Sequence, residues 1–401
     1  MMMHSPRFLT ATPVVFLAIL GLSQQPAEAQ RAPEPIRLGA PTATFPQDFG
    51  AIQTVRELPD GRVLVADPLS KAVYVVDLAE GRRTVVGREG RGPGEYRQPD
   101  AVWPLPGDST LLVDLGNGRL VTVGPDLSFG ASVPIALGDP RPGQGMVMAL
   151  PQGVDGQGRI YARAMGGPGG GPYPDSAAIL RIHRGTRAVD TAATFKLQSV
   201  TQAVSGGAAT SEVRISPIPL SPEDAWGVAP DGSVVVARSA DYRVEWVAPD
   251  GAVTRGPAVP FTPVRIGNAE REEQLLEQGR SGGGIAIGVE MRNDQMSVTF
   301  SRGGAGARGR DAAQYSWPQA KPPFYSGRIP VDPLGRAWVR RHVRAGEPST
   351  YDVFDRRGER VATVLLDHGK RVVGFGKEAV YVVAFDALDL SYLERYALPG
   401  F

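Results

Sequence analysis

The sequence predicts an all-β protein, a six-bladed β-propeller, and two observations carry this prediction. A phrase of an apolar residue, a tight turn built on Asp-Gly or a near variant, and a run of β-branched and aliphatic residues returns six times. The turns recur at about the length of a four-stranded blade, roughly 40 to 50 residues. They are centred on Asp60, Asp108, Asp155, Asp231, Asp332 and Gly376. Six strand–turn–strand units indicate a radial β repeat.

The first blade shows the pattern most clearly. Alternating apolar residues predict strands over 51–58, 62–67, 72–78 and 82–87. Later in the chain two intervals between turns are longer than a blade. They predict insertions at about 165–223 and 261–325 within the propeller that spans 30–401.

The last blade has too few strands of its own. The sequence predicts strands over 370–375, 379–384 and 391–398, and the chain ends at residue 401. Residues 34–42 also have the pattern of a strand, ahead of the first blade. We expect this N-terminal strand to complete the last blade, because that closes the ring and removes an exposed edge.

The first insertion contains the glycine- and proline-rich stretch 165–176, which predicts a loop. In the second insertion, residues 268–279 predict a short helix. Asn268 fits an N-cap, and acidic residues follow in the first turn. The glycine-rich stretches 281–288 and 301–311 are expected to be loosely held.

Three aromatic residues lie among prolines near the end of the second insertion: Trp317, Phe324 and Tyr325. One use for them is to anchor the insertion in the core. The other is to cover the central channel or to offer a surface to a partner. The sequence favours core anchoring and leaves the second use open.

The first 29 residues have the features of a secretory signal peptide. An apolar stretch at 8–22 is followed by Ala27-Glu-Ala29, which predicts cleavage before Gln30. The alternative, a retained anchor, is disfavoured because the stretch is shorter than the ~20 residues that span a bilayer. A periplasmic or secreted protein is therefore expected, with no membrane span in the mature chain. It contains no cysteine, so no disulfide stabilises it.

The formal net charge is +1. So balanced a charge gives no electrostatic attraction to nucleic acid or to anionic lipid, and no nucleic-acid partner is expected.

The strands ending at Asp67 and Asp114 and the linker 87–99, with its Gly-Pro-Gly-Glu-Tyr core, resemble the NHL-repeat-like six-bladed propellers of exported bacterial proteins. The resemblance implies an architecture. Such propellers serve as binding platforms, scaffolds, lactonases and lyases, so it does not select a function. The chain departs from the pattern in later blades, where the second strand ends in arginine or alanine.

The candidate ligand-binding residues lie where the second strands of the blades end. They are Asp67, Asp114, Arg163, Arg238, Arg340, Arg341 and His342. Because these positions share one face of the ring, we expect them around the channel mouth, where carboxylates and guanidiniums could hold a polar ligand. The alternative, favoured for the two aspartates, is that each closes its own turn. His342 is the one histidine that fits acid–base chemistry, with an ordinary exposed histidine as the alternative.

Two functions fit this sequence. The first is an exported platform that binds a small polar ligand or a protein partner at the channel mouth. The alternative is a lactonase-like hydrolase or lyase, with an inter-blade metal such as calcium or with acid–base residues at the mouth. No local metal-ligand set, phosphate-binding loop or serine nucleophile motif is present. Cofactor, ligand identity and catalytic residues are left open.

Overall fold

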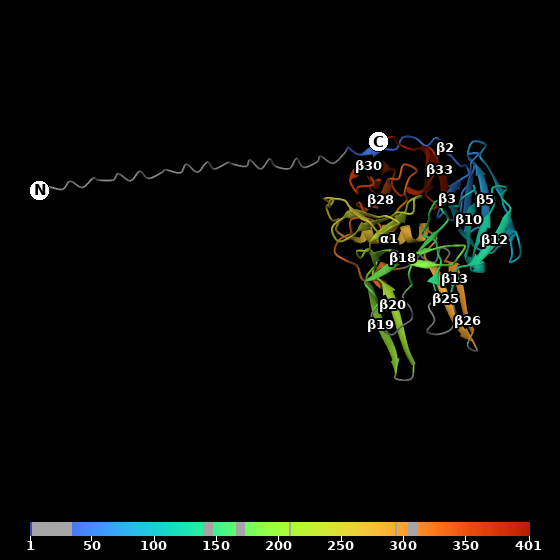
Figure 1. The fold of residues 1–401 in the computed structure, drawn as a ribbon, viewed down its shortest axis with the longest axis horizontal. Helices are drawn as coiled ribbons and strands as arrows, with labels where there is room; N and C mark the ends of the chain where they lie inside the picture. Colours follow the sequence, from blue (N-terminus) through green and yellow to red (C-terminus); the bar gives the residue numbers. More distant parts are fainter. Residues whose placement is uncertain (2–33, 139–146, 166–172, 208–209, 293–294, 304–310) are drawn as a thin grey trace. The chain divides into compact units, whose positions relative to one another are not determined.

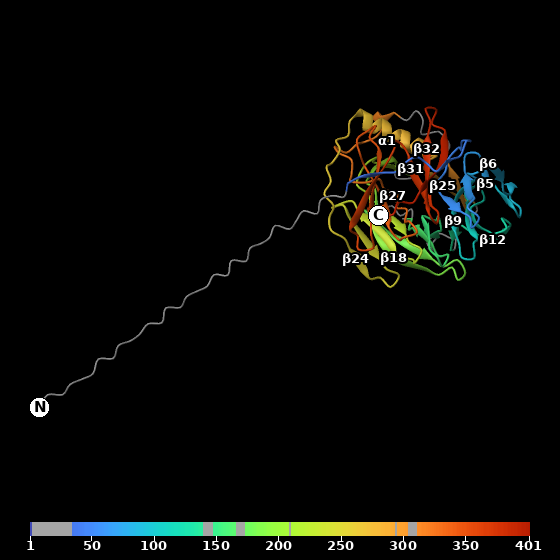
Figure 2. The same cartoon turned by 90° about the horizontal axis from the view of Figure 1, so that it is seen from above.

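Six β-sheets form the blades of a propeller, and the first strand of each is innermost (Figures 1 and 2). The computed structural model describes residues 1, 34–138, 147–165, 173–207, 210–292, 295–303 and 311–401. The inner strands of successive blades lie against each other around the ring. The predicted six-bladed all-β fold is confirmed. The predicted signal peptide lies outside the described residues, apart from Met1.

The first three blades follow one another along the chain. Blade 1 consists of β3 (Val55–Glu57), β4 (Val63–Asp67), β5 (Ala72–Asp77) and β6 (Arg82–Val85). Blade 2 consists of β9 (Pro99–Pro104), β10 (Thr110–Asp114), β11 (Arg119–Val123) and β12 (Phe129–Pro134). Blade 3 consists of β15 (Gly153–Val154), β16 (Ile160–Arg163), β17 (Ser176–Ile182) and β18 (Val189–Lys196). Short strand pairs join them: β7 (Arg88–Glu89) with β8 (Glu95–Tyr96), and β13 (Ala136–Leu137) with β14 (Val147–Met148).

The other three blades contain the second insertion and both ends of the fold. Blade 4 consists of β21 (Ala225–Val228), β22 (Val234–Arg238), β23 (Arg243–Val247) and β24 (Val253–Arg255). Blade 5 consists of β28 (Ala337–Arg341), β29 (Ser349–Phe354) and β30 (Arg360–Leu366). Ahead of them in the chain, β27 (Gly327–Arg328) pairs in parallel with β21 of blade 4. Blade 6 consists of β31 (Arg371–Phe375), β32 (Ala379–Phe385), β33 (Ser391–Ala397) and β2 (Ala43–Thr44). The chain beyond β27 bridges β28 at Val331 and Ala337, which makes it the inner strand of blade 5.

The N-terminal segment closes the ring, as predicted. Strand β2 pairs antiparallel with β33, and the following Phe45 is fully buried. The closing strand starts later than the predicted 34–42, because Pro41 cannot donate to a ladder and interrupts the strand. Ahead of that proline, β1 (Ile36–Arg37) adds in parallel to the outer edge of blade 5. The N-terminus therefore ties two blades together.

Apolar side chains of neighbouring blades pack face to face and form the core. Trp226 of blade 4 packs with Tyr161 of blade 3, and both are almost fully buried. Trp338 of blade 5 packs in the same way against Val380 of blade 6. Burying a large apolar side chain contributes about 1.5 to 3 kcal/mol. These contacts explain why the repeated phrase keeps its apolar half in every blade.

The segment 165–223 contributes more than a loop to the fold. Strands β17 and β18, which complete blade 3, lie within it. A hairpin of β19 (Val200–Gly207) and β20 (Thr210–Pro217) follows and projects from the propeller (Figure 1). The loop predicted at 165–176 falls largely on residues 166–172, which lie outside the described residues.

The second insertion contains the predicted helix, α1 (Asn268–Arg280). Its N-cap is Gly267 and not the expected Asn268. The Gly267 N–H donates to the Glu270 carboxylate (3.0 Å), so the N-terminus is closed by a side chain from within the helix. Figure 2 shows α1 near β31 and β32. None of the described helices combines the length and apolar character that a membrane crossing requires.

The expectation that residues 281–288 are loosely held is wrong. They lead into β25 (Ile285–Arg292), which pairs with β26 (Gln295–Arg302) in a hairpin. Arg302 pairs with Asp100 of blade 2 through two guanidinium nitrogens, and its backbone exchanges hydrogen bonds with the Gln98 side chain. Contacts with a distant blade thus hold a glycine-rich segment in place. The stretch 301–311 lies mostly outside the described residues.

Candidate functional site

A cavity of about 320 Å³ opens at the face of the ring where the second strands end, between the inner strands and helix α1. The polar groups that matter for its chemistry are Ser221, Glu223, Glu277, Tyr325, His342 and Arg371. They come from α1 and from the starts or ends of strands in blades 4, 5 and 6. This position, at the mouth of the channel, is the one that the sequence predicts for a ligand.

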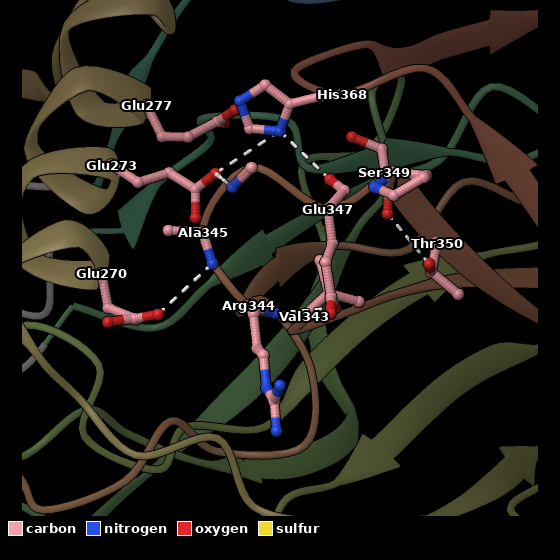
Figure 3. A network of polar contacts seen from close by, with 12 residues as sticks. Glu270, Glu273, Glu277, Val343, Arg344, Ala345, Glu347, Ser349, Thr350 and His368 are labelled. Carbon is pink, nitrogen blue, oxygen red and sulfur yellow. Dashed lines mark hydrogen bonds and ion pairs between the residues drawn. The ribbon is translucent and has the colours of Figure 1, made fainter.

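Helix α1 is held over the mouth by acidic side chains on one of its faces. Glu270, Glu273 and Glu277 recur at helical spacing and point toward the loop 343–347 and His368 (Figure 3). Glu270 accepts a hydrogen bond from the backbone of Ala345 (3.3 Å). The Glu273 carboxylate lies 3.4 Å from the Lys321 ammonium and 3.6 Å from the His368 ring. Polar contacts, not an apolar face, therefore position the helix.

Glu277 forms a largely buried, two-pronged ion pair. Both of its oxygens accept from Arg340, at 3.0 and 3.1 Å, and each side chain is about one-seventh exposed. Burial alone would raise the pKa of Glu277, but the charge and hydrogen bonds of Arg340 lower it below the usual value. The Arg340 guanidinium also lies 4.3 Å from the ring centre of Tyr325. The Arg340 guanidinium is therefore already paired with a side chain of helix α1.

His342 lines the cavity and has one unpaired ring nitrogen. Its side chain is buried, at 8% exposure, and its Nδ1 lies 3.0 Å from the carbonyl oxygen of Pro322. Because a carbonyl only accepts, Nδ1 carries the proton and Nε2 carries a lone pair. Among the described residues, Nε2 has no hydrogen-bond partner.

The same histidine stays neutral over the ordinary pH range. Burial lowers the pKa of His342 to about 3, and the nearby positive charges of Lys321 and Arg340 act in the same direction. The Tyr325 ring lies 3.9 Å away, centre to centre, and fixes the imidazole on one side. The site therefore contains a rigid, uncharged hydrogen-bond acceptor.

Arg371 and Glu223 add charge to the mouth. Arg371 donates to the carbonyl of Ile52 (2.9 Å), and no described carboxylate lies within ion-pair distance of it. Burial lowers its pKa, but an arginine keeps its charge at pH 7. Burial also raises the pKa of Glu223, against the hydrogen bond from Ser326 and the charge of Arg163. The mouth thus offers a cation, a carboxyl group and a neutral acceptor.

The two aspartates predicted as ligands accept hydrogen bonds from within the fold. Asp67 is fully buried and accepts backbone hydrogen bonds from residues 50, 51, 69 and 70. Asp114, also fully buried, accepts from the backbone of Arg97 and Gln98 and from two side chains of blade 2. Asp67 therefore closes its own turn through residues 69 and 70, as in the turn-closing alternative, whereas Asp114 holds the segment that leads into blade 2.

The remaining arginines differ in position. Arg163 donates to the hydroxyl of Tyr173 (2.8 Å), and Arg238 pairs with Asp224 (3.1 Å) and Glu245 (2.8 Å). Neither of these two arginines lines the mouth cavity.

Arg341 lies beside a second cavity, of about 650 Å³, at the rim of blades 4 and 5. His342 lines both this rim cavity and the mouth cavity. Of the seven predicted residues, His342 lines the mouth cavity, and Arg340 contacts two residues that line it, Glu277 and Tyr325.

Sequence reasoning missed Glu223, Glu277 and Arg371. Arg371 carried a usable signal, since it is a charged residue at the start of a predicted inner strand. Glu277 lies on the predicted helix, at the spacing that puts it on the same face as Glu270. Within the described part of the chain, no group of three or more histidines, cysteines or carboxylates is arranged to hold a metal ion.

The fold defines the class of this protein, a six-bladed β-propeller. No protein-family model matches the chain, and no curated protein matches it. Among solved structures it is similar to virginiamycin B lyase from Staphylococcus aureus (12% identity, 90% of this chain, 99% of that chain, TM-score 0.39). It is also similar to a gluconolactonase from Xanthomonas campestris (10% identity, 92% and 99%, TM-score 0.39). These matches carry no information about ligand or activity.

Proposed function

We propose that this protein is an exported binding protein whose channel mouth holds a small polar ligand. The observation that carries the proposal is the buried Nε2 of His342, an acceptor beside a cavity of about 320 Å³ with no partner among the described residues. A buried acceptor left unpaired costs about 1 to 3 kcal/mol. A ligand that supplies an N–H or O–H donor recovers this energy.

The other groups at the mouth narrow the ligand chemistry. Arg371 is a cation without a carboxylate partner among the described residues, so it suits a carboxylate or another anionic group. Glu223, with its raised pKa, can share a proton with a hydroxyl or a second acid. A small hydroxy acid or sugar acid has both kinds of group. The proposal places this binding in the periplasm or outside the cell, after cleavage before Gln30.

The hydrolase or lyase alternative would use His342 and Glu223 as its acid–base pair. Both side chains line the same cavity, which is the observation in its favour. However, a base with a pKa of about 3 accepts protons poorly near pH 7, because efficient bases titrate near the working pH. The arrangement therefore favours binding over turnover.

The test is a thermal-shift screen of the mature protein, residues 30–401, against small hydroxy acids, sugar acids and their lactones. We expect at least one compound to raise the melting temperature, since ligand at 100 times its Kd adds about 2.7 kcal/mol. Calorimetry should then show at least about a tenfold loss of affinity, or about 1.4 kcal/mol, in His342→Leu and in Arg371→Met.

His183→Leu is the matched control, because this histidine lies at the turn between β17 and β18, away from the mouth. It should bind like the wild type. The proposal is contradicted if no compound shifts the melting temperature, or if binding survives unchanged in both mouth variants. Conversion of a lactone during the screen would favour the enzyme alternative.

A further inference from the structure

A second cavity, of about 250 Å³, lies inside the central channel at the end away from the mouth. Inner strands of all six blades line it, and it shares no lining residue with the mouth cavity. One residue from each blade is Val55, Trp103, Val154, Val228, Val331 and Val373. The lining is apolar except for a few groups, and the most unusual of these is an arginine.

The Arg328 side chain extends across the channel. It starts on β27, which pairs with β21 of blade 4 and leads into the inner strand of blade 5, and it donates a hydrogen bond to the carbonyl of Val373 in blade 6 (2.8 Å). Its guanidinium carbon lies 5.3 Å from the ring centre of Trp103 in blade 2. Blades 2 and 5 face each other in a ring of six, so a contact between them places the guanidinium in the lumen.

No countercharge accompanies this arginine. Across the described residues, no carboxylate lies within ion-pair distance of Arg328. Burial and the charge of Arg371 lower its pKa to about 10, which leaves it protonated at pH 7. The carboxylate that lines the cavity, Asp332, is occupied by the Arg336 guanidinium (2.6 Å) and the Trp338 indole (3.0 Å). A buried charge without a partner costs several kcal/mol.

Trp103 provides a second donor at the same cavity. Its side chain is 8% exposed, and its indole N–H has no hydrogen-bond partner among the described residues. The cavity is thus lined by an arginine without a countercharge and by a tryptophan whose indole N–H is unpaired among the described residues. Both groups are complementary to an anion with oxygen acceptors, and a cavity of this size exceeds what a single water fills.

We propose that the central channel binds a small oxyanion, the chemistry shared by phosphate, sulfate and carboxylate groups, at Arg328 and Trp103. The guanidinium fork would bind two oxygens of the anion, and the indole N–H would donate to the anion as well. The site is separate from the channel mouth and does not rest on the function proposed for the mouth. Its ligand neutralises the arginine that crosses the ring and links blades 2, 5 and 6.

The experiment uses the mature protein titrated with inorganic phosphate, sulfate and acetate, at an ionic strength held constant with sodium chloride. We expect at least one oxyanion to bind with a Kd of about 1 mM or tighter and to raise the melting temperature over the chloride reference. Binding should also change tryptophan fluorescence, and this change should be absent in Trp103→Phe. The three anions distinguish a tetrahedral anion from a carboxylate.

Arg328→Met should weaken oxyanion binding at least about tenfold, whereas Arg328→Lys should retain part of it because the charge remains. The melting temperature with anion is compared with the melting temperature without anion for each variant separately. A change in the basal stability of a variant therefore does not obscure the result. Arg184→Met is the matched control: Arg184 is also desolvated but donates to Thr122, outside the channel. It should bind like the wild type, and so should His342→Leu.

Two results would overturn the proposal. One is the absence of binding by all three oxyanions in that concentration range. The other is equal binding by the wild type, Arg328→Met and Trp103→Phe, which would place the anion elsewhere on the protein. If Arg328→Met does not fold, Arg328→Lys and Trp103→Phe still decide between the outcomes.

Discussion

Blades 1 and 2 differ from blade 5 in what happens where the second strand ends. In the first two blades the strand ends in Asp67 or Asp114. Both carboxylates are fully buried and accept hydrogen bonds from the backbone of the same protein. In blade 5 the strand ends in Arg340 and Arg341 and is followed by His342. Arg340 contacts the insertion, and His342 keeps a nitrogen unpaired among the described residues.

The difference teaches where this propeller has polar groups left for a ligand. A regular repeat uses its recurring aspartates to satisfy backbone N–H groups, which a buried strand end requires. Where the repeat is interrupted by the insertion, the strand end is covered by a helix, and its side chains pair imperfectly. The unpaired polar groups at the channel mouth therefore result from the insertion that interrupts the repeat.

The largest effect in this comparison is expected from Glu277→Gln, which removes the carboxylate that holds Arg340. The charged guanidinium then remains buried without a partner, which typically costs about 3 to 5 kcal/mol. Denaturant unfolding of the mature protein measures this loss. Glu272→Gln on the same helix is the control, since Glu272 is exposed, and it should change stability by less than about 0.5 kcal/mol.

A double variant sharpens that prediction. Replacing the pair by Glu277→Leu with Arg340→Met should restore much of the stability, because apolar residues often substitute for a buried ion pair at little cost. An unchanged stability in Glu277→Gln would show that the helix is held in another way.

Asp67→Ala in blade 1 is expected to lower the free energy of unfolding by a smaller amount, about 2 to 3 kcal/mol, because backbone donors lose their acceptor in a buried site. Asp77→Ala is the matched control. Asp77 also accepts from two backbone N–H groups, at Ala79 and Glu80, but on the surface, where water replaces it. Equal losses in the two variants would contradict the contrast drawn between buried and exposed turns.

Most of the fold follows from local sequence. The repeated turn and its apolar strands predict six blades because each blade uses the same short-range pattern. The ring closure was predictable as well, since an incomplete last blade requires an extra strand. Residues 281–288 were not, because their strand depends on Arg302 binding Asp100, about 200 positions earlier in the chain.

The site was predictable only in part. Arg340 and His342 were found because the end of a predicted strand is a local feature. Glu277 and Glu223 reach the mouth from the insertion and from the segment before blade 4. The helical spacing of Glu277 shows which face of the helix it shares with Glu270, but the placement of Glu277 and Glu223 at the mouth depends on long-range contacts that the sequence does not reveal. For the same reason Arg328 showed no sign of crossing the channel.

The contribution of His342 to the pH dependence of stability is the smallest of these effects when taken per pH unit. The pKa of His342 is about 3 in the folded protein, below the value near 6.5 of an unfolded chain. The unfolded state therefore takes up a proton first as pH falls. The contribution of His342 to the free energy of unfolding is therefore fully present above about pH 6.5. It declines toward pH 3 by at most about 1.4 kcal/mol per pH unit. His342→Gln should flatten that decline.

The most direct test of the mouth as a ligand site is the protonation state of His342, measured by long-range proton–nitrogen NMR on the mature protein. Three histidines are present in residues 30–401, and His342→Gln identifies the signal. We predict a neutral ring with its proton on Nδ1, a free lone pair on Nε2, and no titration between pH 8 and pH 5. A proton on Nε2, or a titration midpoint near 6.5, would contradict the account.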